Sequence, residues 1–241
     1  LFRSMNAKAV AEQTILLMLG VIKNVVSGDQ AVRDGRQMAV KMGYMGGGSL
    51  KELSDCTVGL IGFGAIARAV ADMLQGFGVT VYYTKRHRLS PEEEARYQVQ
   101  YLSMDELLKT CDMLSLHVPV TGETAGMCSR EFFAKCRKGS YFINTSRGEL
   151  VDDEALREAL ENGTIAMAGL DTLDHEPVQK DHPMLSWPEK TLAKLLFSPH
   201  IGGITGSSFH RGYAMIWEDI EKLSRGETPG HIVNQRELDQ R

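Results

Sequence analysis

The stretch VGLIGFGAIA, residues 58–67, decides the fold of this chain, because an apolar strand runs directly into a glycine turn and then into a helix. Gly62 permits a tight turn, and Gly64 lets a phosphate approach the backbone closely. Ala67 stands where a third glycine is usual and is still small enough for close packing of helix on strand. The start of the helix offers unpaired N–H groups and the positive end of its dipole. The pattern therefore predicts a dinucleotide-binding turn, with a purely structural turn as the alternative.

Short β-rich runs alternate with helical patterns along the chain from this turn onward. The strand-like runs are 58–61, 79–83, 99–102, 113–116, 141–144, 165–170 and 195–198, and the helical patterns are 66–75, 104–109, 130–135, 153–161 and 208–223. Such alternation is typical of parallel strands joined by crossover helices. We therefore predict an α/β fold with a doubly wound parallel sheet of Rossmann type and about seven strands. Its chemistry is expected at the carboxyl ends of the strands.

The exit of the second expected strand bears on the choice of cofactor. In this fold an acidic residue about 20 residues after the glycine turn binds the ribose 2′-hydroxyl of NAD. No Asp or Glu lies between Asp72 and Glu92, and the strand leaves as TKRHR, residues 84–88. Arginine can bind a 2′-phosphate through two parallel hydrogen bonds, and threonine can donate another. The sequence therefore favours NADP(H) over NAD(H); a solvated basic loop is the alternative.

Three later strands each lead into a residue of catalytic type. The strand at 141–144 runs into Arg147, the strand at 165–170 into a loop that carries Glu176, and the strand at 195–198 into His200. Any one of these would be explained as a surface ion pair or a structural histidine. Together, at the edge that also carries the glycine turn, they indicate an active site.

Six motifs give the chain a family resemblance. They are NAKAVAEQT at 6–14, GFGAIA at 62–67, SLHVPVT at 115–121, NTSRG at 144–148, GLDTLDHEP at 169–177 and PHIGG at 199–203. With these motifs in this order, the chain resembles the D-isomer-specific 2-hydroxyacid dehydrogenases. The resemblance extends from residue 6 to about residue 234. Several motifs in register are far more specific than any one of them.

The resemblance implies an enzyme that transfers a hydride between NADP(H) or NAD(H) and a small 2-oxo or D-2-hydroxy acid, with glyoxylate or hydroxypyruvate favoured. In such an enzyme Arg147 would bind the carboxylate and 2-oxo oxygen of the substrate, where its fixed positive fork opposes the developing negative charge. His200 would be the general acid, and Glu176 would hydrogen-bond His200 and favour its charged form. Asp171 would bind the nicotinamide carboxamide.

The expected cofactor-binding residues come from the glycine turn, the exit of the second strand and the later motifs. They are Gly62, Gly64, Ala65, Ile66, Thr84, Lys85, Arg86, Val118, Pro119, Thr145, Ser146, Asp171, Gly202 and Gly203. We expect no metal site.

The resemblance also divides the chain into segments. Residues 1–26 would hold an interdomain segment and the first helix of the cofactor domain, which Asn6 would cap. Residues 27–50 would form a loop resembling a dimerisation arm. Within it the residue pattern itself predicts a weaker helix over 30–37 and a flexible break at 43–48. Residues 51–226 would form the dinucleotide-binding domain. Residues 227–241 would be a tail that returns toward a substrate-binding domain.

The flavodoxin-like substrate-binding domain that precedes the cofactor domain in this family has no counterpart in the sequence, so we expect the chain to be part of a longer protein. Backbone amides from that domain and closure of the two domains would then be missing. We therefore expect this chain alone to bind dinucleotide and to reduce 2-oxo acids poorly.

Apolar residues in the arm-like segment suggest a partner. Val32, Met38, Val40, Met42 and Met45 lack an evident partner within the domain, as expected for a homodimer that forms through the cofactor domain. A loosely packed loop is the alternative.

Composition narrows the function classes. The net charge of -4 gives no electrostatic drive toward nucleic acid or an anionic membrane. The longest apolar run, residues 15–22, is too short to span a bilayer. The four cysteines, Cys56, Cys111, Cys128 and Cys136, lie far apart, which favours free thiols in the cytoplasm.

The resemblance leaves a second candidate function, a dinucleotide-sensing corepressor, because some relatives of this family bind partner proteins while keeping the same motifs.

Overall fold

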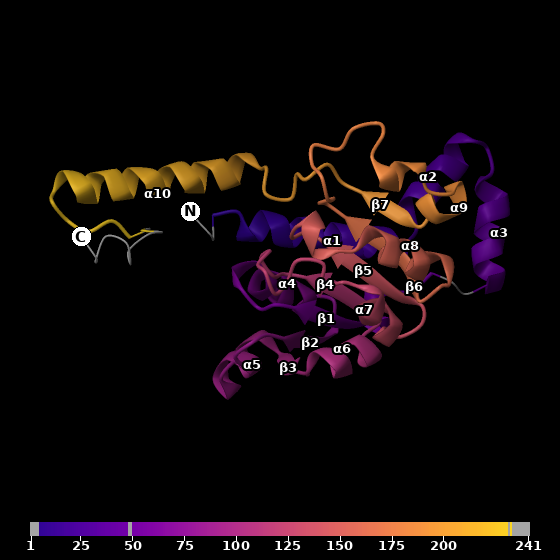
Figure 1. Cartoon of the computed structure of the whole chain (residues 1–241), viewed down its shortest axis with the longest axis horizontal. Helices are drawn as coiled ribbons and strands as arrows, with labels where there is room; N and C mark the ends of the chain where they lie inside the picture. The colour runs from indigo at the N-terminus through magenta and orange to yellow at the C-terminus, as the bar shows by residue number, and fades with distance from the viewer. Residues whose placement is uncertain (1–4, 48–49, 231, 233–241) are drawn as a thin grey trace.

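The computed structural model describes residues 5–47, 50–230 and 232, and within these residues seven strands form one parallel sheet (Figure 1). The strands are β1 (Thr57–Ile61), β2 (Thr80–Thr84), β3 (Val99–Tyr101), β4 (Met113–Leu116), β5 (Ser140–Asn144), β6 (Ile165–Leu170) and β7 (Leu195–Phe197). Their order is β3-β2-β1-β4-β5-β6-β7, and each pair of neighbours is parallel. The predicted doubly wound sheet is confirmed.

Helices cover both faces of this sheet. On one face lie α1 (Ala7–Ile22), α4 (Ala65–Gln75) and α5 (Pro91–Tyr97), and on the other lie α6 (Met104–Thr110), α7 (Arg130–Lys135) and α8 (Asp153–Glu161). Successive residues of a strand serve opposite faces, so Met113 packs with α1 and α4 while Leu114 packs with α6 and α7. Each such fully buried side chain contributes about 1.5–3 kcal/mol to folding.

Further helices lie between these elements. They are α2 (Val25–Arg33), α3 (Gln37–Gly47), α9 (Glu189–Leu192) and the short 3-10 helices η1 (Leu53–Asp55), η2 (Gly148–Leu150) and η3 (Pro183–Ser186). The four cysteines are buried and unpaired, in keeping with the expected free thiols.

The segment before the sheet differs from the expectation. The helix expected over 30–37 has the wrong bounds, because α2 ends at Arg33 and α3 begins at Gln37. The loop expected over 27–50 and the break expected at 43–48 are wrong for the described residues, most of which are helical. The chain turns between these helices at Gly35, where a φ of +70° ends α2. The glycines of α3 stay helical as far as Gly47, and residue 48 lies outside the described residues.

The N-terminus of α1 also differs in detail. Asn6 stands immediately before the helix, but its side chain makes no capping hydrogen bond. Its amide instead packs against Gly203, at which a Cβ would lie 2.6 Å from Asn6 Nδ2. Asn6 therefore joins α1 to the loop after β7.

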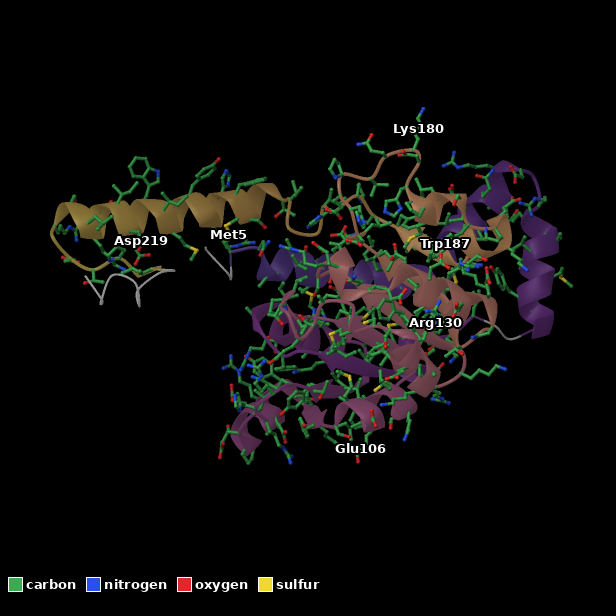
Figure 2. All side chains as sticks on the ribbon, viewed as in Figure 1. Met5, Glu106, Arg130, Lys180, Trp187 and Asp219 are labelled. Carbon is green, nitrogen blue, oxygen red and sulfur yellow. The ribbon has the colours of Figure 1, made fainter. Side chains whose placement is uncertain are left out.

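The last described helix, α10 (Gly206–Ser224), extends away from the sheet (Figure 1), and most of its side chains are exposed among the described residues (Figure 2). Arg211 Nε donates to the carbonyl oxygen of Met5 at 2.7 Å, which ties the start of this helix to the chain just before α1. Of the expected tail at 227–241, residue 231 and residues 233–241 lie outside the described residues.

No single helix in the described part of the chain is long and apolar enough to cross a membrane. The helices α1 and α2 have the length and apolar composition of a membrane span only as a pair, and this pair is bent by 61°. Most of α1 is buried against the sheet, as the core helix of a folded domain is.

Candidate active site

The expected site loops meet at one edge of the sheet. Because every neighbouring pair of strands is parallel, the glycine turn after β1 and the loops after β5, β6 and β7 all leave from the carboxyl edge. Asn144 pairs with Leu170, and Leu170 pairs with Phe197, so the last residues of β5, β6 and β7 are in register. The predicted common rim for the Arg, Glu and His loops is therefore confirmed.

The glycine turn has the geometry of a phosphate cradle. Gly62 has a φ of +92°, and a Cβ there would lie 2.5 Å from the carbonyl oxygen of His117, so no other residue fits without a shift. At Gly64 a Cβ would meet nothing within 4 Å, which leaves open space above the turn. No described side chain caps α4, so its first N–H groups can donate hydrogen bonds to an anion. Ala67 is fully buried, which provides the expected close packing.

A cleft of about 1340 Å³ opens above this turn. It exceeds the roughly 300–1,000 Å³ of ordinary small-ligand pockets, so it has room for an extended ligand. The predicted residues that line it are Gly64, Ala65, Ile66, Val118, Pro119, Thr145, Ser146, Arg147, Asp171, His200 and Gly203. The predicted residues outside its lining are Gly62, Thr84, Lys85, Arg86, Glu176 and Gly202.

The loop after β5 is built by Asn144. Its side-chain Nδ2 donates to the carbonyl oxygen of Arg147 at 2.8 Å, and its Oδ1 accepts from Ser146 N at 2.9 Å. Ser146 Oγ also donates to the carbonyl oxygen of Leu116 at 2.7 Å. Among the described residues, the guanidinium of Arg147 donates only to the carbonyl oxygen of Ser146. Its positive charge is therefore available to an anion in the cleft.

His200 and Glu176 form a hydrogen-bonded pair from two different loops. His200 Nδ1 lies 2.5 Å from Glu176 Oε2, and Glu176 Oε1 accepts from Leu173 N at 3.0 Å. A carboxylate only accepts hydrogen bonds, so the pair places a proton on Nδ1. The side chains are 43% and 31% exposed, respectively. The predicted contact between Glu176 and His200 is present.

The loop after β6 packs directly on the loop after β5. At Gly148 a Cβ would lie 1.9 Å from the carbonyl carbon of Leu173, so the two backbones touch there. His182 holds the other end of the β6 loop, because its Nε2 lies 2.9 Å from the carbonyl oxygen of Asp174 and its Nδ1 accepts from Met184 N at 3.2 Å. His182 is a supporting residue that the sequence reasoning missed.

Both arginines that follow β2 form ion pairs with carboxylates. Thr84 is 7% exposed, and Arg88 is bound to Glu94 by two hydrogen bonds of 2.8 and 2.9 Å. Arg86 reaches across to the loop after β4, where its Nη2 lies 2.6 Å from Glu123 Oε2. Both members of this second pair are largely exposed, so the pair is weak and exchangeable.

His117 was also missed, although it belongs to the SLHVPVT motif. It lines the cleft beside the glycine turn, and its Nε2 lies 2.9 Å from Ser115 Oγ. Burial lowers the pKa of His117 to about 3, so the ring is neutral at physiological pH. Its Nδ1 is shielded and has no hydrogen-bond partner within the described residues.

Comparison with known proteins gives the same assignment as the motifs. Residues 15–202 match the family model of the D-isomer specific 2-hydroxyacid dehydrogenase, NAD binding domain. The chain is 33% identical over 234 residues to a glyoxylate reductase of Korarchaeum cryptofilum and 35% identical over 230 residues to one of Thermofilum pendens. Each alignment covers 95% of this chain and 66% of the relative, so the chain spans slightly less than two thirds of their length.

A solved structure shows the same fold. The apo form of D-mandelate dehydrogenase from Rhodotorula graminis superimposes with a TM-score of 0.85 at 25% identity, over 96% of this chain and 67% of that one. The family model covers most of this chain, and the strand-end motifs meet at one cleft. The chain therefore belongs to the D-isomer specific 2-hydroxyacid dehydrogenase family.

Proposed function

We propose that the protein is a dehydrogenase that transfers a hydride between NADP(H), or NAD(H), and a small 2-oxo or D-2-hydroxy acid. The observation that carries this proposal is the pair of His200 with Glu176 beside the cleft that Arg147 and the glycine turn also line. An acid, a fixed cation and a dinucleotide cradle are the groups that reduction of a 2-oxo acid requires.

Each residue has a defined task in this reaction. Arg147 binds the substrate carboxylate and the 2-oxo oxygen through its free N–H groups. His200 donates the proton of Nε2 to that oxygen and takes it back in the reverse direction. Glu176 keeps the ring oriented through Nδ1 and stabilises its positive charge. A nicotinamide bound in the cleft would supply the hydride to C2 or accept it.

A glyoxylate-like or hydroxypyruvate-like substrate is supported by the names of the relatives, two of which are glyoxylate reductases. A role as a dinucleotide-sensing corepressor has no comparable support. The test is a titration with NADPH and NADH, followed by cofactor absorbance with glyoxylate, hydroxypyruvate and pyruvate. We expect slow turnover, because the 43% exposed His200 is open to water in this chain. A protein that binds neither dinucleotide would refute the proposal.

The cofactor phosphates fit the turn at Gly62 and Gly64, and the preference for NADP(H) rests on Arg86. Its only ion pair among the described residues is with the exposed Glu123, and such a pair contributes little stability. A 2′-phosphate, with more negative charge than one carboxylate, can therefore compete for the guanidinium. Arg88 is a poorer candidate because Glu94 holds it in a bidentate pair.

Replacing Arg86 by alanine is expected to weaken NADPH binding by about 10- to 100-fold, the effect of losing a charged hydrogen bond of ~1.5–3 kcal/mol. Binding of NADH is expected to change little. The measurement is fluorescence titration with both dinucleotides. Arg88→Ala is the matched control, since Glu94 already occupies that side chain. Equal losses of NADPH and NADH affinity in Arg86→Ala would reject the phosphate-reading role.

We also propose a homodimer that forms through α2 and α3. Met38, Met42 and Met45 repeat along one stripe of α3, and each is 57–70% exposed. An apolar stripe of this kind is typical of a surface with a partner. We expect Met42→Glu to shift the protein toward monomer in analytical ultracentrifugation, whereas Gln37→Glu, at an exposed position of α3 away from the methionine stripe, should not. A monomeric unmodified protein at micromolar concentration contradicts the proposal.

A further inference from the structure

The carboxylate of Asp171 holds the loop that carries His200. Asp171 follows β6 directly and is 2% exposed. Its Oδ1 accepts from Ser198 Oγ at 2.5 Å and from Ile201 N at 3.1 Å, and its Oδ2 accepts from Gly202 N at 2.9 Å. These three donors flank His200 on both sides.

Gln13 extends this set of hydrogen bonds to α1. Its Nε2 donates to Ser198 Oγ at 2.8 Å. An amide nitrogen only donates and a carboxylate only accepts, so the hydroxyl proton of Ser198 must point to Asp171. The direction of the chain is therefore fixed, from Gln13 through Ser198 to Asp171.

The backbone of His200 needs such a support. Its φ is +55°, in the left-handed region that residues other than glycine rarely adopt, and it persists only where the surroundings impose it. His200 N donates to the carbonyl oxygen of Ser198 at 3.0 Å, which closes the turn. Residues 198, 201 and 202 are bonded to one buried carboxylate, so the ring between them is directed at Glu176 on the neighbouring loop.

We propose that Gln13 and Ser198 are positioning residues, which act through Asp171 to hold the imidazole of His200 against Glu176. The proposal rests on the proposed function, in which His200 is the general acid. It also gives Asp171 a second task beside that of contacting the nicotinamide. Oδ1 already accepts two hydrogen bonds. Among the described residues Oδ2 accepts only one, so it can accept a second, and Asp171 lines the cleft.

Ser198→Ala removes the hydroxyl that links Gln13 to Asp171. Ser140→Ala is a matched control, because Ser140 is also a buried serine but its Oγ has no hydrogen-bond partner among the described residues. Ser198→Thr keeps a hydroxyl and serves as the conservative variant. Gln13→Leu tests the other end of the chain of hydrogen bonds should Ser198→Ala fail to fold.

The first measurement is independent of turnover. Long-range ¹H–¹⁵N correlation spectra report which ring nitrogen carries the proton, and His200→Gln identifies the signals of His200. At a pH where the ring is neutral, we expect the proton on Nδ1 in the unmodified protein, in Ser140→Ala and in Ser198→Thr. In Ser198→Ala and Gln13→Leu we expect a mixture with the Nε2 form, because the contact with Glu176 is no longer imposed.

The second measurement is turnover of a 2-oxo acid with NADPH. We expect Ser198→Ala to lower kcat by roughly 10- to 100-fold, the effect of a misplaced catalytic group, with an unchanged dissociation constant for NADPH. Spectra and kcat of Ser198→Ala that match those of Ser140→Ala overturn the proposal. If instead the spectra change as expected but His200→Gln retains full turnover, the positioning stands and the proposed catalytic function fails.

Discussion

We expect His200→Gln to lower the turnover of 2-oxo acids by about 10²- to 10⁴-fold, which is the range for removal of a general acid. Glutamine keeps a polar side chain of similar reach but does not carry a transferable proton at neutral pH. The affinity for NADPH should not change, because the phosphate cradle lies at Gly62 and Gly64 and not at the loop after β7. The measurement is cofactor absorbance at saturating NADPH, together with fluorescence titration of the cofactor.

The chain provides a matched control for this variant. His175 has the same φ of +55°, is also exposed and also lies beside a carboxylate, with Nδ1 3.0 Å from Asp174 Oδ2. It does not line the cleft. His175→Gln should therefore keep full turnover. Turnover in His200→Gln that equals turnover in His175→Gln would remove His200 from the mechanism.

The sheet could be predicted from the sequence because parallel strands are buried on both faces. Such strands are continuous apolar runs, and β4 and β6 begin and end at the residues that the sequence predicts. The helix α5 was not predicted, although Ser90 and Glu93 form a capping box before and within it, a recognised start signal. Its seven residues carry too short an apolar pattern for periodicity to reveal it.

The region of α2 and α3 was mispredicted because glycines dominate its local pattern. Glycine is unfavourable in a helix by about 1 kcal/mol per residue, so the glycines at 43, 46 and 47 indicate a break. Asn24 Nδ2 donates to Tyr44 Oη at 2.9 Å, which links α3 back to the residue before α2. Such a contact across 20 residues is not visible in a local pattern.

The candidate site was also predicted only in part. Arg147, Glu176 and His200 were predicted because each lies in a motif at the end of a strand, and the parallel sheet brings the strand ends together. The residues that hold them were not predicted. Gln13 and Ser198 are 185 positions apart, and Glu123 meets Arg86 from a different loop. Supporting contacts of this kind depend on side-chain directions that only the folded chain defines.

Arg147→Ala is expected to lower kcat/KM for 2-oxo acids by about 10²- to 10³-fold, comparable to removal of one oxyanion-stabilising donor. The guanidinium lines the cleft and donates only to the carbonyl oxygen of Ser146 among the described residues, so its remaining N–H groups are available to the substrate. Asn144 holds the loop through backbone groups, so the loop should keep its shape in the variant. NADPH affinity and melting temperature should therefore change little.

Two further arginine variants make this result specific. Arg147→Lys keeps the charge but loses the planar fork, so it should restore only part of kcat/KM. Arg130→Ala removes an exposed arginine at the start of α7 (Figure 2) that is paired with Glu158 and does not line the cleft, and it should leave kcat/KM unchanged. The measurement is kcat/KM with glyoxylate and hydroxypyruvate for all three variants. Full recovery in Arg147→Lys would mean that the site needs only a positive charge, and an unchanged kcat/KM in Arg147→Ala would mean that the substrate binds elsewhere.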